Sequence, residues 1–123
     1  MPAEACTPAT AQTSGMSRMA ALSGDTVGSR ALWMGETHVA PGVSSGPHHH
    51  GESETGIYVV AGNPEFIYSE GGHEVRLQTK PGDYVYVPPF VHHIESNANS
   101  DQEAVVVIAR TTQEAIVENL DEL

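Results

Sequence analysis

The sequence predicts an all-β protein, either a sandwich of two sheets or a small barrel. Short runs of β-branched and aromatic residues recur along the chain, and Gly, Pro, Asn and Asp separate them about every eight to twelve residues. No helical periodicity of apolar residues persists beyond about two turns. A chain of 123 residues corresponds to one domain, which is large enough to bury a hydrophobic core without disulfides.

Six strands are expected, in the order in which their patterns occur. The second and the last are continuous apolar runs, which is typical of strands covered on both faces. In the fourth, Val75, Leu77 and Thr79 share one face, and the fifth ends at Pro88 and Pro89 because proline cannot continue a ladder. The expected strands are Ala31 to Val39, Gly56 to Ala61, Phe66 to Tyr68, Glu74 to Thr79, Tyr84 to Val87 and Ala104 to Ala109.

Turn residues separate these strands and fix their order along the chain. Glu70-Gly71-Gly72-His73 is typical of a hairpin tip. The other expected turns are Ala40-Pro41-Gly42, Gly62-Asn63-Pro64-Glu65, Lys80-Pro81-Gly82-Asp83 and the polar stretch Asn97 to Asp101.

The two ends of the chain show weaker patterns. Residues 1–24 are rich in Ala, Thr, Ser and Pro, and we expect them to form a flexible N-terminal arm or to order only against a partner subunit. The single β-barrel domain is therefore expected to span residues 25–123. The stretch from Gln113 to Leu123 fits either a last strand at Ala115 to Val117 or a short acidic helix.

The composition excludes several classes of partner. The formal net charge is −11, from 16 acidic and 5 basic residues, which argues against binding to nucleic acid or to an anionic membrane. No apolar run reaches about 18 residues, so no membrane span is expected. The first residues lack the basic cluster and apolar stretch of a signal peptide. Cys6 is the only cysteine, which fits a cytoplasmic protein.

Two separate segments of the chain are rich in histidine. In the first, His48 and His50 would share one face of an extended segment, with His49 on the opposite face. The second carries His92 and His93 at the end of an apolar run. Two imidazoles on one face, a nearby carboxylate and a third imidazole from elsewhere predict a site for a divalent transition metal.

The first segment resembles the first motif of the cupin superfamily. That motif reads Gly, five residues, His-x-His, three or four residues, Glu, six residues and Gly. Gly42, His48, His50 and Glu54 fit the pattern, but seven residues separate Glu54 from Gly62.

The second segment resembles the second cupin motif, which reads Gly, five residues, Pro-x-Gly, two residues, His, three residues and Asn. Gly82, Pro88, His93 and Asn97 fit it, and Phe90 replaces the second glycine. The resemblance implies a cupin-type double-stranded β-helix, or jelly roll, with one metal site. It also points to a homodimer, which would cover the outer faces of the two fully apolar strands.

The resemblance implies four metal ligands, namely His48, His50, Glu54 and His93. Counting back from Gly62 instead places Thr55 in the slot of the glutamate and His49 in that of the first histidine. Both counts hold only if a β-bulge absorbs one residue, so the fourth ligand is Glu54 or a further histidine, with His49 as the first alternate. Zinc is the first expectation for the metal, with iron, manganese and nickel as alternatives.

Several large side chains near these motifs are sufficient to line an apolar pocket, although core packing accounts for most of them. They are Trp33, Met34, Tyr58, Phe66, Tyr68, Tyr84, Tyr86 and Phe90. With one lysine and four arginines no densely anionic ligand is expected, whereas Arg76 and Arg110 could bind a single carboxylate. The candidates for proton transfer are Tyr58, Tyr84 and Glu95.

Three functions remain open at this point. The first is a metal-dependent enzyme that polarises a carbonyl group and stabilises an enolate. In size the chain resembles small single-domain cupins that include aromatic polyketide cyclases. This resemblance implies, as the first expectation, an aldol-type ring closure of an aromatic or poly-keto substrate in secondary-metabolite biosynthesis. The second is a non-haem metal dioxygenase of a small aromatic or diketone substrate. The third is a non-catalytic binder of small molecules.

Overall fold

The computed structural model describes the whole chain, residues 1–123, and confirms the all-β fold. Its strands are β1 (Met16–Leu22), β2 (Trp33–Val39), β3 (His48–His49), β4 (Thr55–Ala61), β5 (Glu65–Glu70), β6 (His73–Gln78), β7 (Tyr84–Val87), β8 (His93–Ser96), β9 (Ala104–Arg110) and β10 (Glu118–Asn119). A 3-10 turn, η1 (Ala3–Ala5), and a short helix, α1 (Gly24–Val27), complete the secondary structure. Neither reaches the length and apolar character that a membrane crossing requires.

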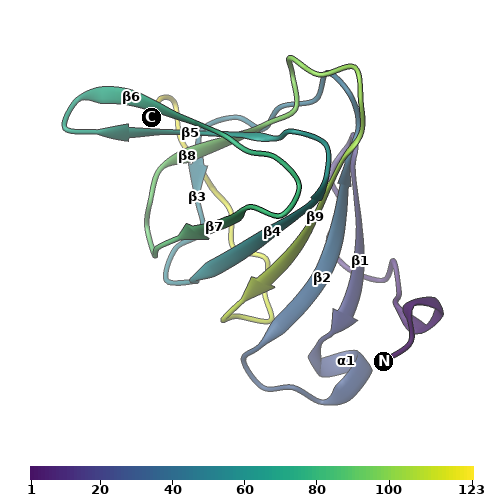
Figure 1. Ribbon diagram of the computed structural model, residues 1–123. Helices are drawn as coiled ribbons and strands as arrows, with labels where there is room; N and C mark the ends of the chain where they lie inside the picture. Colours follow the sequence, from purple (N-terminus) through teal and green to yellow (C-terminus); the bar gives the residue numbers. More distant parts are fainter.

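The strands form two five-stranded antiparallel sheets that lie across from each other (Figure 1). The first sheet has the order β1-β2-β9-β4-β7, and the second has the order β10-β3-β8-β5-β6. Consecutive strands pair in β1–β2 and β5–β6, whereas the other neighbours come from distant parts of the sequence, as β4 between β9 and β7 illustrates. Two facing sheets with this crossed order are the jelly-roll arrangement that the sequence predicts.

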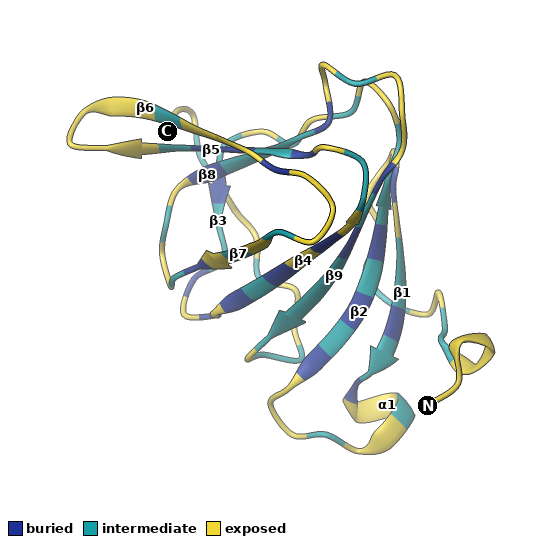
Figure 2. Cartoon of the chain, viewed as in Figure 1, coloured by how far each residue is buried: buried dark blue, intermediate teal, exposed yellow.

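The hydrophobic core lies between the sheets and follows from the alternation of side chains along each strand. On β4, Ile57 and Val59 are 3% and 0% exposed, whereas Tyr58 and Val60 between them are exposed. Figure 2 shows this alternation as dark blue segments along β4 and β2. The core cluster consists of Ile57, Val59, Phe66, Val87 and Val106.

The structure differs from the expected boundary between arm and domain. Met16–Leu22 falls within the expected arm of residues 1–24, yet it forms β1 and pairs with β2. Its inward side chains, Met16 and Ala20, are buried. The sequence pattern missed this strand because its apolar residues, Met, Ala and Leu, include none of the β-branched or aromatic types that are enriched in strands.

The C-terminal stretch adopts neither of the two expected forms. Ala115 to Val117 lies outside any strand, and the two-residue β10 that follows pairs with β3. Beside this pair, the Leu120 N–H donates a hydrogen bond to the carbonyl oxygen of Pro47 at 2.9 Å. The end of the chain therefore holds the first histidine segment in place.

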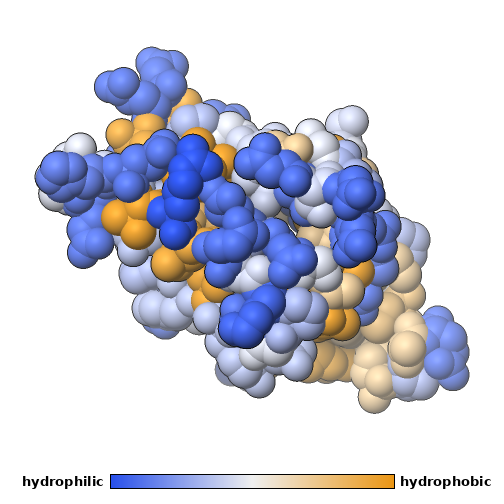
Figure 3. All heavy atoms as spheres, turned by 45° about the horizontal axis from the view of Figure 1, so that its top comes forward, coloured by the Kyte–Doolittle hydropathy of each residue, from blue (hydrophilic) through white to orange (hydrophobic).

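Hydrophilic side chains cover most of the molecular face in Figure 3, and hydrophobic atoms appear there in separate small patches. This surface agrees with the formal net charge of −11. A charged exterior of this kind favours solubility.

The three glycines at the motif positions all have left-handed backbone conformations. Gly42, Gly62 and Gly82 have φ angles of 76°, 79° and 96°, a region that side chains with a Cβ rarely adopt. Gly62 has a second requirement, because an added Cβ would lie 2.7 Å from the carbonyl oxygen of Glu103 and 2.8 Å from Cα of Ala104. A Cβ added at Gly42 would have no other heavy atom within 4 Å.

Gly62→Ala is expected to destabilise the fold more than Gly42→Ala. Both substitutions place a Cβ in left-handed backbone, which costs about 1–2 kcal/mol. Only at Gly62 must neighbouring backbone also shift, which lowers the free energy of unfolding by about a further 1–3 kcal/mol. Urea denaturation followed by the fluorescence of Trp33 measures both losses. Equal losses would contradict a packing role for Gly62.

Candidate metal centre

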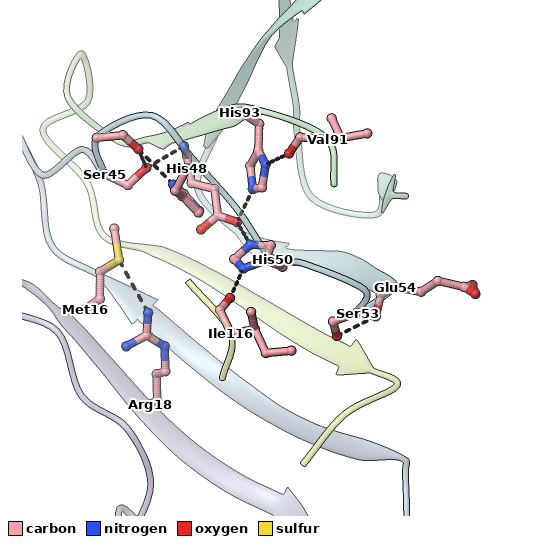
Figure 4. A network of polar contacts seen from close by, with 12 residues as sticks. Met16, Arg18, Ser45, His48, His50, Ser53, Glu54, Val91, His93 and Ile116 are labelled. Atoms are coloured by element: carbon pink, nitrogen blue, oxygen red, sulfur yellow. Dashed lines mark hydrogen bonds and ion pairs between the residues drawn. The ribbon is translucent and has the colours of Figure 1, made fainter. Parts of the chain in front are cut away.

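Four side chains from two distant places in the chain converge between the sheets. His48 lies on β3 and His50 follows that strand directly, while His93 and Glu95 lie on β8. One nitrogen or oxygen atom from each of the four lies within 4.8 Å of the others. Figure 4 shows the three imidazole rings close together, with centroids 4.4 to 4.9 Å apart. We call these four residues the metal-binding group.

The pairing of β3 with β8 brings the two histidine segments together. His48 lies directly opposite His93 in this antiparallel pair. Because residues two apart on an extended segment share a face, His50 lies on the same side as His48, and Glu95 lies on the same side as His93. Two short strands are therefore sufficient to assemble the group.

Backbone carbonyl groups fix the orientation of all three imidazole rings. Each ring donates from Nδ1, and the acceptors are the carbonyl oxygens of Gly46 for His48, of Ile116 for His50 and of Val91 for His93, at 2.8, 2.8 and 2.9 Å. A carbonyl oxygen only accepts hydrogen bonds, so each Nδ1 carries a proton and each Nε2 is free to face the shared centre. Partners of this kind orient histidines that bind metals.

Burial and charge act in opposite directions on the pKa values of the group. Burial raises the pKa of the Glu95 carboxyl, but His50 and His93 together outweigh burial and hold this pKa well below its usual range. Oε1 of Glu95 lies 3.2 Å from Nε2 of His93 and 3.7 Å from Nε2 of His50. Burial lowers the pKa of His93, but the hydrogen bond and charge of Glu95 raise it overall.

His48 has no such partner, and burial keeps its pKa below the ordinary value. The group therefore combines imidazoles whose pKa values shift in opposite directions with a carboxylate of lowered pKa, and a bound metal ion would displace any proton from the ring nitrogens that hold it. Three imidazole nitrogens and one carboxylate oxygen suit zinc, iron, manganese or nickel. The donor set thus fits a divalent transition metal.

The carboxylate of the metal-binding group is Glu95, whereas Glu54, the expected ligand, lies outside the group in this structure. Ser53, Thr55 and Ile57 are buried, so the alternation along this segment turns Glu54 outward. Its Oε1 instead accepts a hydrogen bond from the hydroxyl of Tyr86 at 3.1 Å, on the surface.

A β-bulge accounts for the irregular spacing of the first motif. The register of β4 against β9 shifts by one residue between Val59 and Ala61, directly before Gly62, so the extra residue is absorbed there. Counting forward from Gly42 therefore identifies the two histidines of this segment that lie in the group, His48 and His50. Thr55 takes the inward position that the backward count assigns to it.

The alternate ligand His49 points away from the metal-binding group. Its Nδ1 accepts a hydrogen bond from the Gly51 N–H at 3.0 Å, and its ring stacks on His92 with centroids 5.5 Å apart. The ring centroid of Phe90 lies 5.8 Å from that of His49. Phe90 is also the one non-glycine residue with a positive φ, 62°, which explains why the cupin motif has glycine at this position.

Two of the three candidates for proton transfer lie outside the barrel. Tyr58 and Tyr84 face outward from β4 and β7, with ring centroids 4.8 Å apart, and they are 36% and 81% exposed. Neither tyrosine therefore lies beside the metal-binding group in this structure. Because Gly56 to Ala61 is apolar on both faces, its pattern could not tell the inner face from the outer one. Glu95, the third candidate, lies within the group.

Three cavities adjoin the metal-binding group, the smallest of about 40 Å³ beside Glu95. Of the other two, the smaller, of about 150 Å³, contains His50 and Glu95 in its wall, together with Thr55 and two arginines. The larger, of about 390 Å³, begins at His93 and is mainly apolar. Its large lining residues are Phe66, Tyr68, Leu77, Tyr86 and Val91. Of the eight side chains expected to line an apolar pocket, this cavity contains Phe66, Tyr68 and Tyr86. The others, Trp33, Met34, Tyr58, Tyr84 and Phe90, lie outside it.

Two facing antiparallel sheets that enclose three imidazoles and a carboxylate define a β-barrel protein with a metal-binding group. The family model described as "Cupin domain" matches residues 35–109, a range that contains the whole group. The chain therefore belongs to the cupin family.

Solved structures with the same fold include several of oxalate decarboxylase from Bacillus subtilis. The structure of that enzyme at pH 4.6 is 21% identical, with a TM-score of 0.73, and the match covers 89% of this chain and 28% of that chain. A structure concerned with the Mn(II) centres of the same enzyme is also 21% identical, with a TM-score of 0.73, over 93% of this chain and 30% of that chain. This chain thus spans less than a third of the length of that enzyme, and the likeness establishes the shared fold. No curated protein matches the sequence.

His50→Ala and His93→Ala are each expected to abolish metal retention, because each removes a nitrogen ligand that no other side chain replaces. Glu95→Gln is expected to weaken retention by about ten- to a hundredfold, since it removes the one negative charge of the group. Elemental analysis of the purified variants measures metal content, and competition with a chelator measures affinity.

Two variants serve as controls for this experiment. Glu54→Gln and His73→Ala alter a carboxylate and an imidazole that are exposed and outside the group, so both should retain metal as the unaltered protein does. Full metal content in His50→Ala or His93→Ala would refute the assignment of the group.

Proposed function

We propose that this cupin is a metal-dependent enzyme whose metal-binding group holds a divalent transition metal against an oxygen atom of a small-molecule substrate. The observation that carries this proposal is the convergence of three Nε2 atoms, each oriented by a carbonyl acceptor, beside a carboxylate of lowered pKa. A metal ion bound there supplies a Lewis acid that polarises a carbonyl group and stabilises the charge of an enolate.

The residues of the chain contribute position and charge. The carbonyl partners hold the rings of His48, His50 and His93 in place before any ligand binds, so little reorganisation is needed. The ionised Glu95 reduces the net charge of a divalent site to +1. A metal ion held by these four residues would have coordination positions left for oxygen atoms of a substrate if its coordination number were above four.

The larger cavity supports a substrate with an apolar or aromatic part. Phe66, Tyr68 and Tyr86 contribute ring surfaces to its wall, and His93 joins it to the metal-binding group. An aromatic or poly-keto compound fits this combination, with the ring in the cavity and a carbonyl oxygen directed at the group. We therefore propose aldol-type ring closure, as in polyketide cyclases of secondary metabolism, as the reaction.

Cys6 forms no disulfide, in keeping with a cytoplasmic location.

A non-haem metal dioxygenase is the second candidate. Three imidazoles and a carboxylate also suit redox-active manganese and iron, and the related oxalate decarboxylase of Bacillus subtilis is described with Mn(II) centres. The metal and the consumption of oxygen therefore separate the two candidates.

Protein loaded in turn with Zn(II), Mn(II) and Fe(II) is expected to convert poly-β-keto compounds with zinc as well as with manganese, and without oxygen uptake. The reason is that Lewis-acid chemistry needs charge but no change of oxidation state. An oxygen electrode and product analysis by mass spectrometry measure both quantities. Oxygen uptake that depends on Fe(II) or Mn(II) would favour the dioxygenase, and tight binding without turnover would identify a non-catalytic binder.

We also propose that two copies of the chain associate through the outer face of the first sheet. Tyr58 and Val60 on β4 and Tyr84 on β7 are 36%, 46% and 81% exposed, and Val107 lies opposite Tyr58 on the adjacent β9. Exposed apolar side chains gathered on one face of a sheet favour an interaction site, and two copies of one face can cover each other about a twofold axis.

Light scattering is expected to give the mass of a dimer for the unaltered protein and that of a monomer for Tyr58→Glu, because the substitution places a charge in the centre of the contact. Val27→Glu is the matched control, since Val27 is 52% exposed on α1 and lies outside the sheet. A monomeric mass for the unaltered protein would refute the dimer.

A further inference from the structure

The basic side chains of this acidic protein are divided between its surface and its interior. Arg76 forms ion pairs with Glu65 and Glu74 on the surface, so it is not free to bind a substrate carboxylate as the sequence allows. Lys80 pairs with Asp83. Arg30 is exposed. The remaining two arginines, Arg18 and Arg110, both line the cavity of about 150 Å³ that also contains His50 and Glu95.

Arg110 is held rigidly at the end of β9. Its guanidinium group lies 4.0 Å from the ring centroid of Trp33, its partner in the strand pairing. Nε and Nη2 donate to the carbonyl oxygens of Thr112 and Gln113 at 2.9 and 2.7 Å. These partners are neutral, and Arg110 has no ion pair with a carboxylate among the salt bridges of the chain.

Arg18 reaches the same cavity from β1. Nη1 donates to Oγ1 of Thr13 at 2.8 Å, and Nη2 lies 3.9 Å from the sulfur of Met16. In Figure 4 its guanidinium group extends from its strand toward the layer that holds the histidines. Like Arg110, Arg18 has no carboxylate partner. It was not a candidate in the sequence because it falls within the stretch expected to be a flexible arm.

The two arginines also influence each other. Burial lowers the pKa of Arg110 to about 10, and the positive charge of Arg18 contributes to this shift. Two guanidinium groups that are close enough to repel each other, without a negative partner, are unfavourable in a partly buried position. A divalent ion in the adjacent metal-binding group adds further positive charge, which Glu95 offsets only in part.

A second polar group lies unpaired deeper between the sheets. Arg18 also lines a small cavity of about 40 Å³ next to Thr37 and Glu95. Thr37 is 4% exposed, and its Oγ1 has no hydrogen-bond partner. An unpartnered hydroxyl beside an unpaired arginine adds a further polar contact for an oxygen-bearing ligand.

We propose that Arg18 and Arg110 bind the carboxylate of the substrate, so that the substrate is a small keto acid whose carbonyl oxygen faces the metal-binding group. Guanidinium groups match the geometry of a carboxylate and bind it with charge-assisted hydrogen bonds. The volume of about 150 Å³ limits the charged end to a few atoms, while an apolar remainder has room in the larger cavity beyond His93. The carbonyl part of this inference depends on the proposed function, whereas the carboxylate part depends only on the arginines.

The test compares acetoacetate with its neutral methyl ester, using the full chain loaded with Mn(II) and titration calorimetry. Acetoacetate is expected to bind at least about tenfold more tightly than the ester, because a charge-assisted pair is lost in the ester. Arg18→Met is expected to remove this preference while metal content stays unchanged. Arg30→Met, which removes an exposed arginine, should bind acetoacetate as the unaltered protein does.

Two further measurements keep the outcome clear. Arg110→Met removes the stacking on Trp33 and can disturb the fold, so Arg110→Lys is used beside it, and it should show an intermediate affinity for acetoacetate. Equal binding of acid and ester by the unaltered protein, or an unchanged preference in Arg18→Met, would overturn the inference while leaving the metal proposal intact. A protein that binds no metal yet prefers the acid through Arg18 would instead refute the proposed function and support the carboxylate site.

Discussion

The assembly of the metal-binding group depends on the pairing of two short strands, β3 and β8. Strand β3 contains only two residues and meets β8 at the single pair His48 and His93. So short a pairing is marginal on its own, and the C-terminal stretch reinforces it from the other side. Strand β10 pairs with β3, and the carbonyl oxygen of Ile116 accepts from Nδ1 of His50. A segment without a clear pattern in the sequence therefore positions one ligand and supports another.

The fold and the three histidines could be predicted from the sequence, because each rests on a local rule. Period-two alternation, turn residues and glycines that need positive φ define the strands and their ends. The spacing of His48 and His50 on one face needs no tertiary information. Strand β1 could not be predicted in the same way, since Met16–Leu22 owes its conformation to pairing with β2 rather than to its own propensity.

Glu95, the carboxylate of the metal-binding group, could also have been identified from the alternation along its strand. Period two relates Glu95 to His93 as it relates His50 to His48, and the sequence contains this signal. The family spacing drew attention to Glu54 instead, which lies one residue out of phase with the inward positions Ser53 and Thr55. Because a shift of one residue moves a side chain to the opposite face of a strand, a match in spacing alone does not identify a ligand.

The surface of this protein carries mainly negative charge, whereas two arginines line the cavity beside the metal-binding group. The net charge of −11 repels anions at long range, but salt screens such repulsion within about 8 Å at physiological ionic strength. Inside the cavity the low dielectric strengthens the field of the nearest groups. These are the two arginines, Arg18 and Arg110, and the carboxylate of Glu95, together with any metal ion that the three histidines would hold. The acidic surface and the cationic cavity are therefore compatible, because they act over different distances. Selection of an anionic ligand would then depend on the few side chains that contact it and not on the charge of the whole molecule.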